Sequence, residues 1–199
     1  VLAEVEAECG WMYETWHPHG DDPNRVKGKI NFTVWSDVLL CPNCGQEMTF
    51  WDMAVDLENN KIQKYWECPG CNSLLSKSPQ KDSSALRAER VLETKYDRNL
   101  ETVITQVSQK PVRINYSVGN KRFIKKLDDF DSQLIQKTEN TELPFFIPCN
   151  RMPVGEESRR NDDIGLTHIH HFYTKRNALV YSCLFHKAKK NYLKYLITS

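Results

Sequence analysis

"CPNCGQEMTF", residues 41–50, places two cysteines three positions apart around a Pro-Asn turn. One such pair is ambiguous, because it suits a redox pair, half of a metal site or two small core residues. A second pair, "CPGC" at residues 68–71, follows after a gap of 23 residues. Two matching knuckles of this kind are typical of a four-cysteine metal site.

The four cysteines predict a structural zinc site whose ligands are Cys41, Cys44, Cys68 and Cys71. Zinc prefers four soft ligands in a tetrahedron at about 2.3 Å, and each knuckle supplies two sulfurs on one side of a tight turn. A thioredoxin-like pair or ordinary core thiols would explain one pair, but not two with a proline after each first cysteine. With four protein ligands no position is left for water, so we expect the metal to stabilise the fold rather than to catalyse.

The residues next to the knuckles fit this prediction. Each knuckle needs a residue that tolerates a positive φ after its second cysteine, and Gly45 and Asn72 occupy those positions. The aromatic residues around the site are expected to pack on a small ribbon rather than to form a stacking surface; they are Trp35, Phe50, Trp51, Tyr65 and Trp66. The remaining cysteines have no partner spacing and are predicted to be ordinary buried or partly buried thiols; they are Cys9, Cys149 and Cys183.

The composition indicates a folded intracellular protein. Of the 199 residues, 40% are hydrophobic and five are tryptophan, which favours a packed core over disorder. No run approaches the roughly 18 apolar residues of a membrane span, and no signal-peptide pattern opens the chain. We therefore expect a cytoplasmic protein without a membrane partner, in a compartment where cysteines serve as metal ligands rather than disulfides.

The charge is unevenly distributed. The net charge is only +1, but residues 111–199 carry 15 Lys and Arg against 9 Asp and Glu. An anionic partner is expected to dock in this C-terminal part.

The pattern along the chain predicts an α+β fold: a small β-rich zinc ribbon plus a mixed hairpin and helix region with a long C-terminal helix. The predicted regions are an N-terminal helix and loop at 1–27, the zinc ribbon at 28–80 and a mixed region at 81–199. The expected elements are a helix at 2–9, a loop at 17–28, strands at 29–40, 48–57 and 61–68, a linker at 76–90, a hairpin at 112–126, a helix at 128–140, an irregular segment at 143–165 and a helix from Thr174 to Ile197. The chain enters a helical pattern directly at Val1 and ends on an apolar one, so we expect a piece of a longer protein.

Six cations are candidates for DNA contact. Lys121, Arg122, Lys125 and Lys126 lie on the predicted hairpin, and Arg159 and Arg160 lie in the predicted irregular segment. Acidic residues stand beside both groups, so a solvated surface with local ion pairs is the alternative.

The stretch "THIHHFYTKRN" at 167–177 holds three histidines, His168, His170 and His171. On a strand, His168 and His170 would point the same way and could share a metal. No Asp, Glu or Cys stands at a matching spacing, so we prefer a polar, hydrogen-bonded junction before the last helix.

Several blocks of the chain, in order, resemble the central segment of bacterial site-specific, adenine-specific DNA methyltransferases that contain a zinc ribbon. The blocks are "GKINFTVWSDV" (28–38), "CPNCG" (41–45), "ECPGC" (67–71), "PVRINYSVGNKR" (111–122) and "RMPVGEESRRNDDIGLTHIHHFYTKRN" (151–177). The resemblance covers roughly residues 28–177 and implies an inserted target-recognition region beside a flanking methyltransferase domain. Only the four zinc ligands carry over from the family residue by residue.

The chain departs from that family where catalysis would occur. It has no Phe-x-Gly cofactor loop, and "DDPN" at 21–24 lacks the second proline and the aromatic of the Asp-Pro-Pro-aromatic motif. We therefore expect S-adenosylmethionine to bind only in the complete parent enzyme, and this chain alone to be inactive. The alternatives are a zinc-ribbon module that braces the catalytic domain, or a free-standing adaptor that binds a protein.

Overall fold

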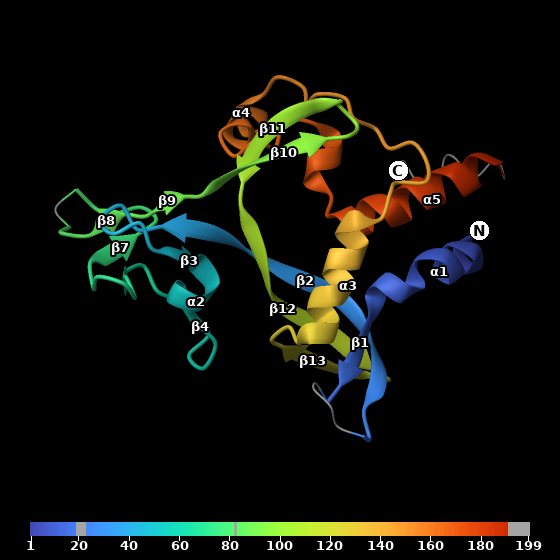
Figure 1. Cartoon of the computed structure of the whole chain (residues 1–199), viewed down its shortest axis with the longest axis horizontal. Coiled ribbons are helices and arrows are strands. Elements are labelled where there is room, and N and C mark those ends of the chain that lie inside the picture. Colours follow the sequence, from blue (N-terminus) through green and yellow to red (C-terminus); the bar gives the residue numbers. More distant parts are fainter. Residues whose placement is uncertain (19–22, 82, 191–199) are drawn as a thin grey trace. The chain divides into compact units, whose positions relative to one another are not determined.

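The computed structural model describes residues 1–18, 23–81 and 83–190 (Figure 1). The chain divides into two compact units: unit 1 combines Val1–Thr33 with Arg113–Ser199, and unit 2 is Val34–Val112. Unit 2 is therefore inserted between the two halves of unit 1, and the predicted boundaries after residues 27 and 80 are not the boundaries of these units. The predicted fold class is confirmed, since helices and strands are mixed and a C-terminal helix follows.

Unit 1 contains most of the helices. Its elements are α1 (Leu2–Cys9), a 3-10 turn η1 (Gly10–Tyr13), β1 (Glu14–His17), the first part of β2 (Val26–Leu40), the end of β12 (Gln109–Val118), β13 (Lys121–Lys125), α3 (Asp129–Asn140), α4 (Glu156–Asp162), η2 (Ile169–Phe172) and α5 (Lys175–Lys190). The predicted helix at 2–9 is confirmed. Residues 191–197 of the predicted last helix lie outside the described residues.

The sheet of unit 1 has the strand order β1-β2-β12-β13. The predicted hairpin is confirmed: β12 and β13 pair antiparallel around Gly119-Asn120, and Gly119 has a φ of 56° that its turn requires. Helix α3 lies across this sheet (Figure 1), and its Leu134 packs with Ile30, Ile114 and Tyr116. Because alternate side chains of a strand point to one face, this packing sets which side chains of β12 and β13 enter the core.

A second core joins the N- and C-terminal helices of unit 1. Val5 and Cys9 of α1 pack with Leu179 and Cys183 of α5, together with Met12. The Sγ atoms of Cys9 and Cys183 lie 3.8 Å apart, and burial raises the pKa of Cys9 to about 12. Both cysteines are therefore inert buried thiols, as the sequence predicts.

Unit 2 is a small β-rich ribbon. Its elements are the end of β2, β3 (Glu47–Thr49), α2 (Phe50–Ala54), β4 (Val55–Asp56), β5 (Lys61–Ile62), β6 (Trp66–Glu67), β7 (Leu74–Ser76), β8 (Leu86–Arg87), β9 (Glu89–Arg90), β10 (Leu92–Asp97), β11 (Thr102–Val107) and the start of β12. Its core contains Leu39, Met48, Ala54, Trp66 and Leu75, with Cys41 and Cys68 buried among them.

The structure differs from several of the predicted elements. The predicted strand at 61–68 consists of two short strands, β5 and β6, that belong to different sheets, and the predicted loop at 17–28 overlaps β2, which begins at Val26. The predicted strand at 48–57 is interrupted by α2, which starts because the Thr49 side chain accepts a hydrogen bond from the Asp52 N–H. The predicted linker at 76–90 is part of the ribbon, since β7 pairs with β8 and β9 pairs with β2. The predicted irregular segment at 143–165 contains α4.

Among the described residues, no helix combines the length and the apolar character that crossing a membrane requires.

Candidate metal centre

The first cysteine knuckle is a tight turn closed by two backbone hydrogen bonds. The Gly45 N–H donates to the Cys41 carbonyl, and the Cys41 N–H donates to the Gln46 carbonyl, both at 2.9 Å. Gly45 has a φ of 74°, in the left-handed region that the turn requires. This geometry presents Cys41 and Cys44 from the same side of the turn.

The second knuckle repeats the first bond for bond. The Asn72 N–H donates to the Cys68 carbonyl and the Cys68 N–H donates to the Ser73 carbonyl, again both at 2.9 Å. Asn72 has a φ of 58°, which confirms the role predicted for it from the sequence.

The two knuckles bring the four sulfurs together. The Sγ atoms of Cys41 and Cys71 lie 3.7 Å apart and those of Cys44 and Cys68 3.6 Å apart, and all four lie within 4.8 Å of one another. A tetrahedron with metal–sulfur bonds of about 2.3 Å has edges of about 3.8 Å, so these separations suit a single ion. The four cysteines are free thiols, because these sulfur–sulfur separations are much longer than the roughly 2.05 Å of a disulfide bond.

The ribbon core fixes one sulfur from each knuckle. Cys41 and Cys68 are buried, whereas Cys44 is exposed and Cys71 is half-buried. Phe50 and Trp66 pack edge to face with ring centroids 5.6 Å apart in the same core, so these two aromatics serve packing, as predicted. The site therefore has a rigid inner side and an accessible outer side.

Hydrogen bonds make one thiol of the cluster acidic. The Ser73 hydroxyl lies 3.2 Å from Cys71 Sγ and accepts a hydrogen bond from Asn43 at 3.1 Å. The hydrogen bond with Ser73, followed by that with Asn43, lowers the pKa of Cys71 to about 5. The Gln46 backbone lowers the pKa of Cys44, but its neighbouring thiols, Cys71 above all, outweigh this and raise it to about 12.

The donor set fits a thiophilic cation. Four sulfurs surround one centre, one of them already favours the thiolate, and a dication would displace the protons of the others. Cys41, Cys44, Cys68 and Cys71 can therefore hold a metal such as zinc. Ser73 and Asn43 were not predicted from the sequence; Ser73 directly follows the positive-φ residue of its knuckle and Asn43 lies between the two cysteines of the other, so both positions could be searched for polar residues.

The structure corrects the prediction for Lys125. Its ammonium lies 2.7 Å from Asp131 and 2.9 Å from Asp128, and its side chain is only 4% exposed. Lys125 follows the inward-facing pattern of β13, because it pairs in register with the buried Ile114. It is a core residue and cannot reach a phosphate.

The other three hairpin cations are at the surface. Lys121, Arg122 and Lys126 are exposed, and among the described residues none of them has an acidic partner. Lys121 and Arg122 directly follow the Gly119-Asn120 turn, and the stretch 118–126 contains no acidic residue.

Arg159 and Arg160 lie on helix α4 rather than on an irregular segment. Arg159 and Arg151 both pair with Asp162, and Arg160 pairs with Glu157 at 2.7 Å. Glu156–Asp162 holds two cations against three acidic residues, so this helix is net negative and disfavours a polyanion.

The three histidines surround a 3-10 turn instead of a strand. The Thr167 N–H donates to His171 Nδ1 at 3.2 Å, and Thr167 Oγ1 lies 2.8 Å from His168 Nδ1. His168 also precedes η2 as its capping residue. These contacts agree with the polar, hydrogen-bonded junction that the sequence analysis preferred.

Comparison of the chain with protein-family models, with curated proteins and with solved structures finds no match. The resemblance to adenine-specific DNA methyltransferases therefore stays a prediction.

Proposed function

We propose that this chain is the zinc-ribbon and target-recognition region of a bacterial site-specific DNA methyltransferase. In this role it contributes to binding duplex DNA and carries no catalysis of its own. The observation that supports the zinc ribbon is the four-sulfur cluster of Cys41, Cys44, Cys68 and Cys71, at separations that suit one tetrahedral ion. The methyltransferase part of the proposal rests on the resemblance of residues 28–177 to that family.

The ion proposed for the cluster is structural Zn²⁺. Four protein thiolates fill its coordination shell, so it would supply folding energy rather than a reactive water. Unit 2 is made of short strands, several of them only two residues long, and a small core. Such a ribbon depends on a metal because few apolar contacts are available to offset the entropy of ordering the chain.

The metal proposal is tested by metal analysis of the full chain. We expect about one zinc ion per chain, and we expect Cys68→Ser to lose the metal and to unfold unit 2. Cys149→Ser is the matched control, because Cys149 lies outside the cluster. A metal-free preparation with a fully folded ribbon would contradict the proposal.

The DNA proposal rests on the β12–β13 hairpin. Lys121, Arg122 and Lys126 carry three exposed charges without acidic partners among the described residues, so phosphate contacts require no internal ion pair to break. A hairpin end with Lys and Arg suits positioning contacts to the backbone, and Arg122 is the residue suited to reading a base edge.

The matched test compares hairpin and helix. Duplex binding should weaken steeply with salt, and the triple change of Lys121, Arg122 and Lys126 to Ala should lower the slope of log K against log salt by about 2–3. The double change of Arg159 and Arg160 to Ala should leave the slope nearly unchanged, because those guanidiniums already pair with carboxylates. If the triple and double variants changed the salt slope equally, or if duplex binding did not depend on salt, the hairpin would not be the DNA-contacting surface.

The chemistry of methylation is assigned to the flanking methyltransferase domain. In the proposed assembly S-adenosylmethionine binds there, and this chain supplies no cofactor contact. The purified chain should therefore show no methyl transfer to DNA in the presence of S-adenosylmethionine. Methyl transfer by the isolated chain would contradict the assignment of catalysis to the flanking domain.

A structural or adaptor role is the second candidate, and the β10–β11 hairpin favours it. Leu92, Tyr96 and Val103 are 58–61% exposed. The antiparallel register places them on one face, since Tyr96 pairs with Val103 and Leu92 lies four residues before Tyr96. An apolar strand face of this kind suits a protein partner. Unchanged DNA binding after the hairpin substitutions, with loss of binding to the methyltransferase domain after Tyr96→Ser, would favour this role.

A further inference from the structure

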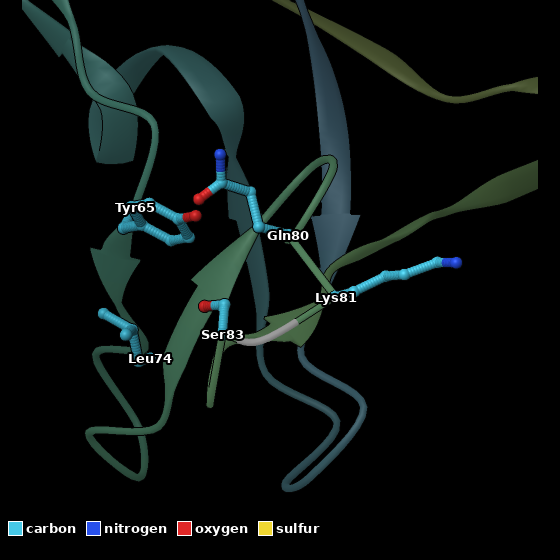
Figure 2. A pocket seen from close by; sticks show the side chains of 5 residues that line it. All are labelled: Tyr65, Leu74, Gln80, Lys81 and Ser83. Atoms are coloured by element: carbon cyan, nitrogen blue, oxygen red, sulfur yellow. The ribbon is translucent and has the colours of Figure 1, made fainter.

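Unit 2 contains a hollow of about 550 Å³ on the ribbon, separate from the four sulfurs. Its lining residues are Tyr65, Leu74, Gln80, Lys81 and Ser83. Figure 2 shows the Gln80 carboxamide and the Ser83 hydroxyl pointing to the side on which Tyr65 and Leu74 lie, whereas the Lys81 side chain points away. The hollow therefore combines an aromatic ring, an aliphatic wall and polar groups that converge on it.

The local fold holds these residues in place. Tyr65 directly precedes β6, and Leu74 pairs with Glu67 across the β6–β7 ladder. On the opposite side, the Ser83 N–H donates to the Gln80 carbonyl at 3.0 Å, and the Ala85 N–H donates to Ser83 Oγ at 3.1 Å. One wall of the hollow thus comes from the β6–β7 ladder, and the other comes from a segment held by individual hydrogen bonds at Gln80 and Ser83.

Two polar groups of the hollow remain available to a ligand. Within the part of the chain that the structure describes, neither the Tyr65 hydroxyl nor the Gln80 carboxamide has a hydrogen-bond partner. The carboxamide offers both donors and an acceptor, a pattern that matches the edge of a nucleobase. Ser83 uses its oxygen as an acceptor, so its hydroxyl proton can still be donated.

A lysine ammonium lies beside the aromatic wall of the hollow. The Lys64 ammonium lies 5.7 Å from the centroid of the Tyr65 ring, and Lys81 stands at the rim. Both ammonium groups are exposed and carry no acidic partner among the described residues. A ligand with a flat ring and an adjacent negative charge would contact the Tyr65 ring, the Gln80 carboxamide and the Lys64 ammonium together.

We propose that this hollow binds one unpaired base of a nucleic acid, which stacks on Tyr65 and pairs its edge with the Gln80 carboxamide. Leu74 bounds the hollow, and Lys64, whose ammonium lies beside the Tyr65 ring, is the cation nearest to the phosphate of the bound nucleotide. Stacking on an aromatic ring tolerates any base, and ligand pockets of roughly 300–1,000 Å³ are ordinary in size. The inference rests on the proposed function for the source of the base, which is DNA held by the same protein.

The direct test uses nucleotides instead of DNA. The full chain, labelled with ¹⁵N and carrying its metal, is titrated with the four nucleoside monophosphates and with ribose 5-phosphate. We expect saturable shifts of the Gln80 side-chain amide and of the Tyr65 and Ser83 backbone amides with nucleotides, and none of comparable size with ribose 5-phosphate. Equal shifts with ribose 5-phosphate would show that only the phosphate binds, and no shift with any nucleotide would equally overturn the proposal.

Matched variants locate the site. Tyr65→Ala should weaken nucleotide binding by roughly 5- to 100-fold, whereas Tyr65→Phe should keep most of it, because the stacking ring remains. Gln80→Ala should weaken binding and flatten the differences among the four bases. The controls are Tyr96→Ala and Gln63→Ala, which remove the same side-chain types from exposed positions of unit 2 outside the hollow. If the two control variants bound nucleotides as weakly as Tyr65→Ala, the hollow would not be the binding site.

Two readouts separate this inference from the proposed function. Zinc content and circular dichroism establish that each variant is folded. If Tyr65→Ala does not fold, Gln80→Ala still tests the hollow, because it removes only an exposed side chain. Duplex DNA with one unpaired base should bind the chain more tightly than fully paired duplex, and Tyr65→Ala should remove this preference without changing the salt slope. If the chain binds nucleotides but not duplex DNA, the proposed function is refuted and base binding in the hollow stands. If the chain binds duplex DNA but no nucleotide, only base binding in the hollow is refuted.

Discussion

The ammonium of Lys125 lies 2.7 Å from the carboxylate of Asp131, and Asp131 is completely buried. The Thr15 hydroxyl donates to the same carboxylate at 2.6 Å. Asp131 and Asp128 also form the reciprocal cap of helix α3. One carboxylate therefore joins β1, β13 and the start of α3, the three elements that define the unit 1 sheet and its covering helix.

Removal of this carboxylate should strongly destabilise unit 1. Asp131→Ala leaves the Lys125 charge buried with fewer partners and removes half of the helix cap, so we expect a loss of about 3–5 kcal/mol in the free energy of unfolding. Urea denaturation followed by circular dichroism measures it. Asp129→Ala is the control, because Asp129 lies exposed in the same first turn. A loss below about 1 kcal/mol for Asp131→Ala would show that the ion pair is not structural.

The residue after the second knuckle should tolerate glycine but not a β-branched residue. Asn72 has a φ of 58°, which costs a side chain branched at Cβ about 1–2 kcal/mol or more. We expect Asn72→Val to weaken zinc binding by roughly 5- to 30-fold and Asn72→Gly to leave it nearly unchanged. Competition with a chelator gives both affinities. Equal affinities of the two variants would mean that this backbone conformation does not limit the site.

The close approach of Gly28 to β12 should make that glycine sensitive to substitution. A Cβ on Gly28 would lie 2.7 Å from Cδ2 of the buried Tyr116 and 3.2 Å from the Ser117 carbonyl oxygen. Gly28→Ala should therefore cost about 1–3 kcal/mol in the free energy of unfolding. Gly10→Ala is the matched control, since its new Cβ would meet only the flexible Glu6 side chain at 3.7 Å. Similar unfolding midpoints for both variants would contradict this packing.

The stability of unit 2 should fall in acid partly through Asp37. Burial opposes the charged form, but hydrogen bonds from Gln109, Lys77 and Arg90 outweigh it and hold the pKa of Asp37 below its ordinary value of 3.8. The unfolded state therefore binds this proton more readily, so the contribution is present above that ordinary value and is lost as the pH falls below it.

Urea denaturation between about pH 6 and pH 3 checks the sign of this dependence. Asp37→Asn should lower stability at neutral pH and show a smaller further loss in acid than the unaltered chain. Glu93→Gln, at an exposed position of β10, should reproduce the acid dependence of the unaltered chain. Parallel pH profiles for Asp37→Asn and the unaltered chain would contradict the role of Asp37.

The four-cysteine cluster was predictable because its determinants are local. Cysteine spacing, the prolines and the positive-φ positions all lie within two stretches of five residues, and the structure repeats the same hydrogen bonds in both. The β12–β13 hairpin was predictable for the same reason, since Gly119-Asn120 marks its turn.

The role of Lys125 could not be read from its neighbours in sequence. Its partner Asp131 sits on a helix and Thr15 on a strand more than a hundred residues earlier, so burial is visible only after the sheet is assembled. Helix α2 was not predicted because the aromatic residues Phe50 and Trp51 are of a type that is common in strands. Thr49 and Asp52 nevertheless supply a helix-capping signal. Helix α4 likewise had a readable start in Gly155 followed by two glutamates.

The insertion of unit 2 between Thr33 and Arg113 has a consequence for the order of assembly. β2 and β12 are neighbours in the unit 1 sheet, so pairing them in an unfolded chain means closing a loop as long as all of unit 2. Once the ribbon has formed, the hydrogen bond from the Val38 N–H of β2 to the carbonyl of Ser108 already holds the start of β12 near β2, because Ser108 directly precedes β12. If a metal ion binds the four cysteines, its binding would therefore favour the pairing of β2 with β12 by shortening the loop that remains to be closed.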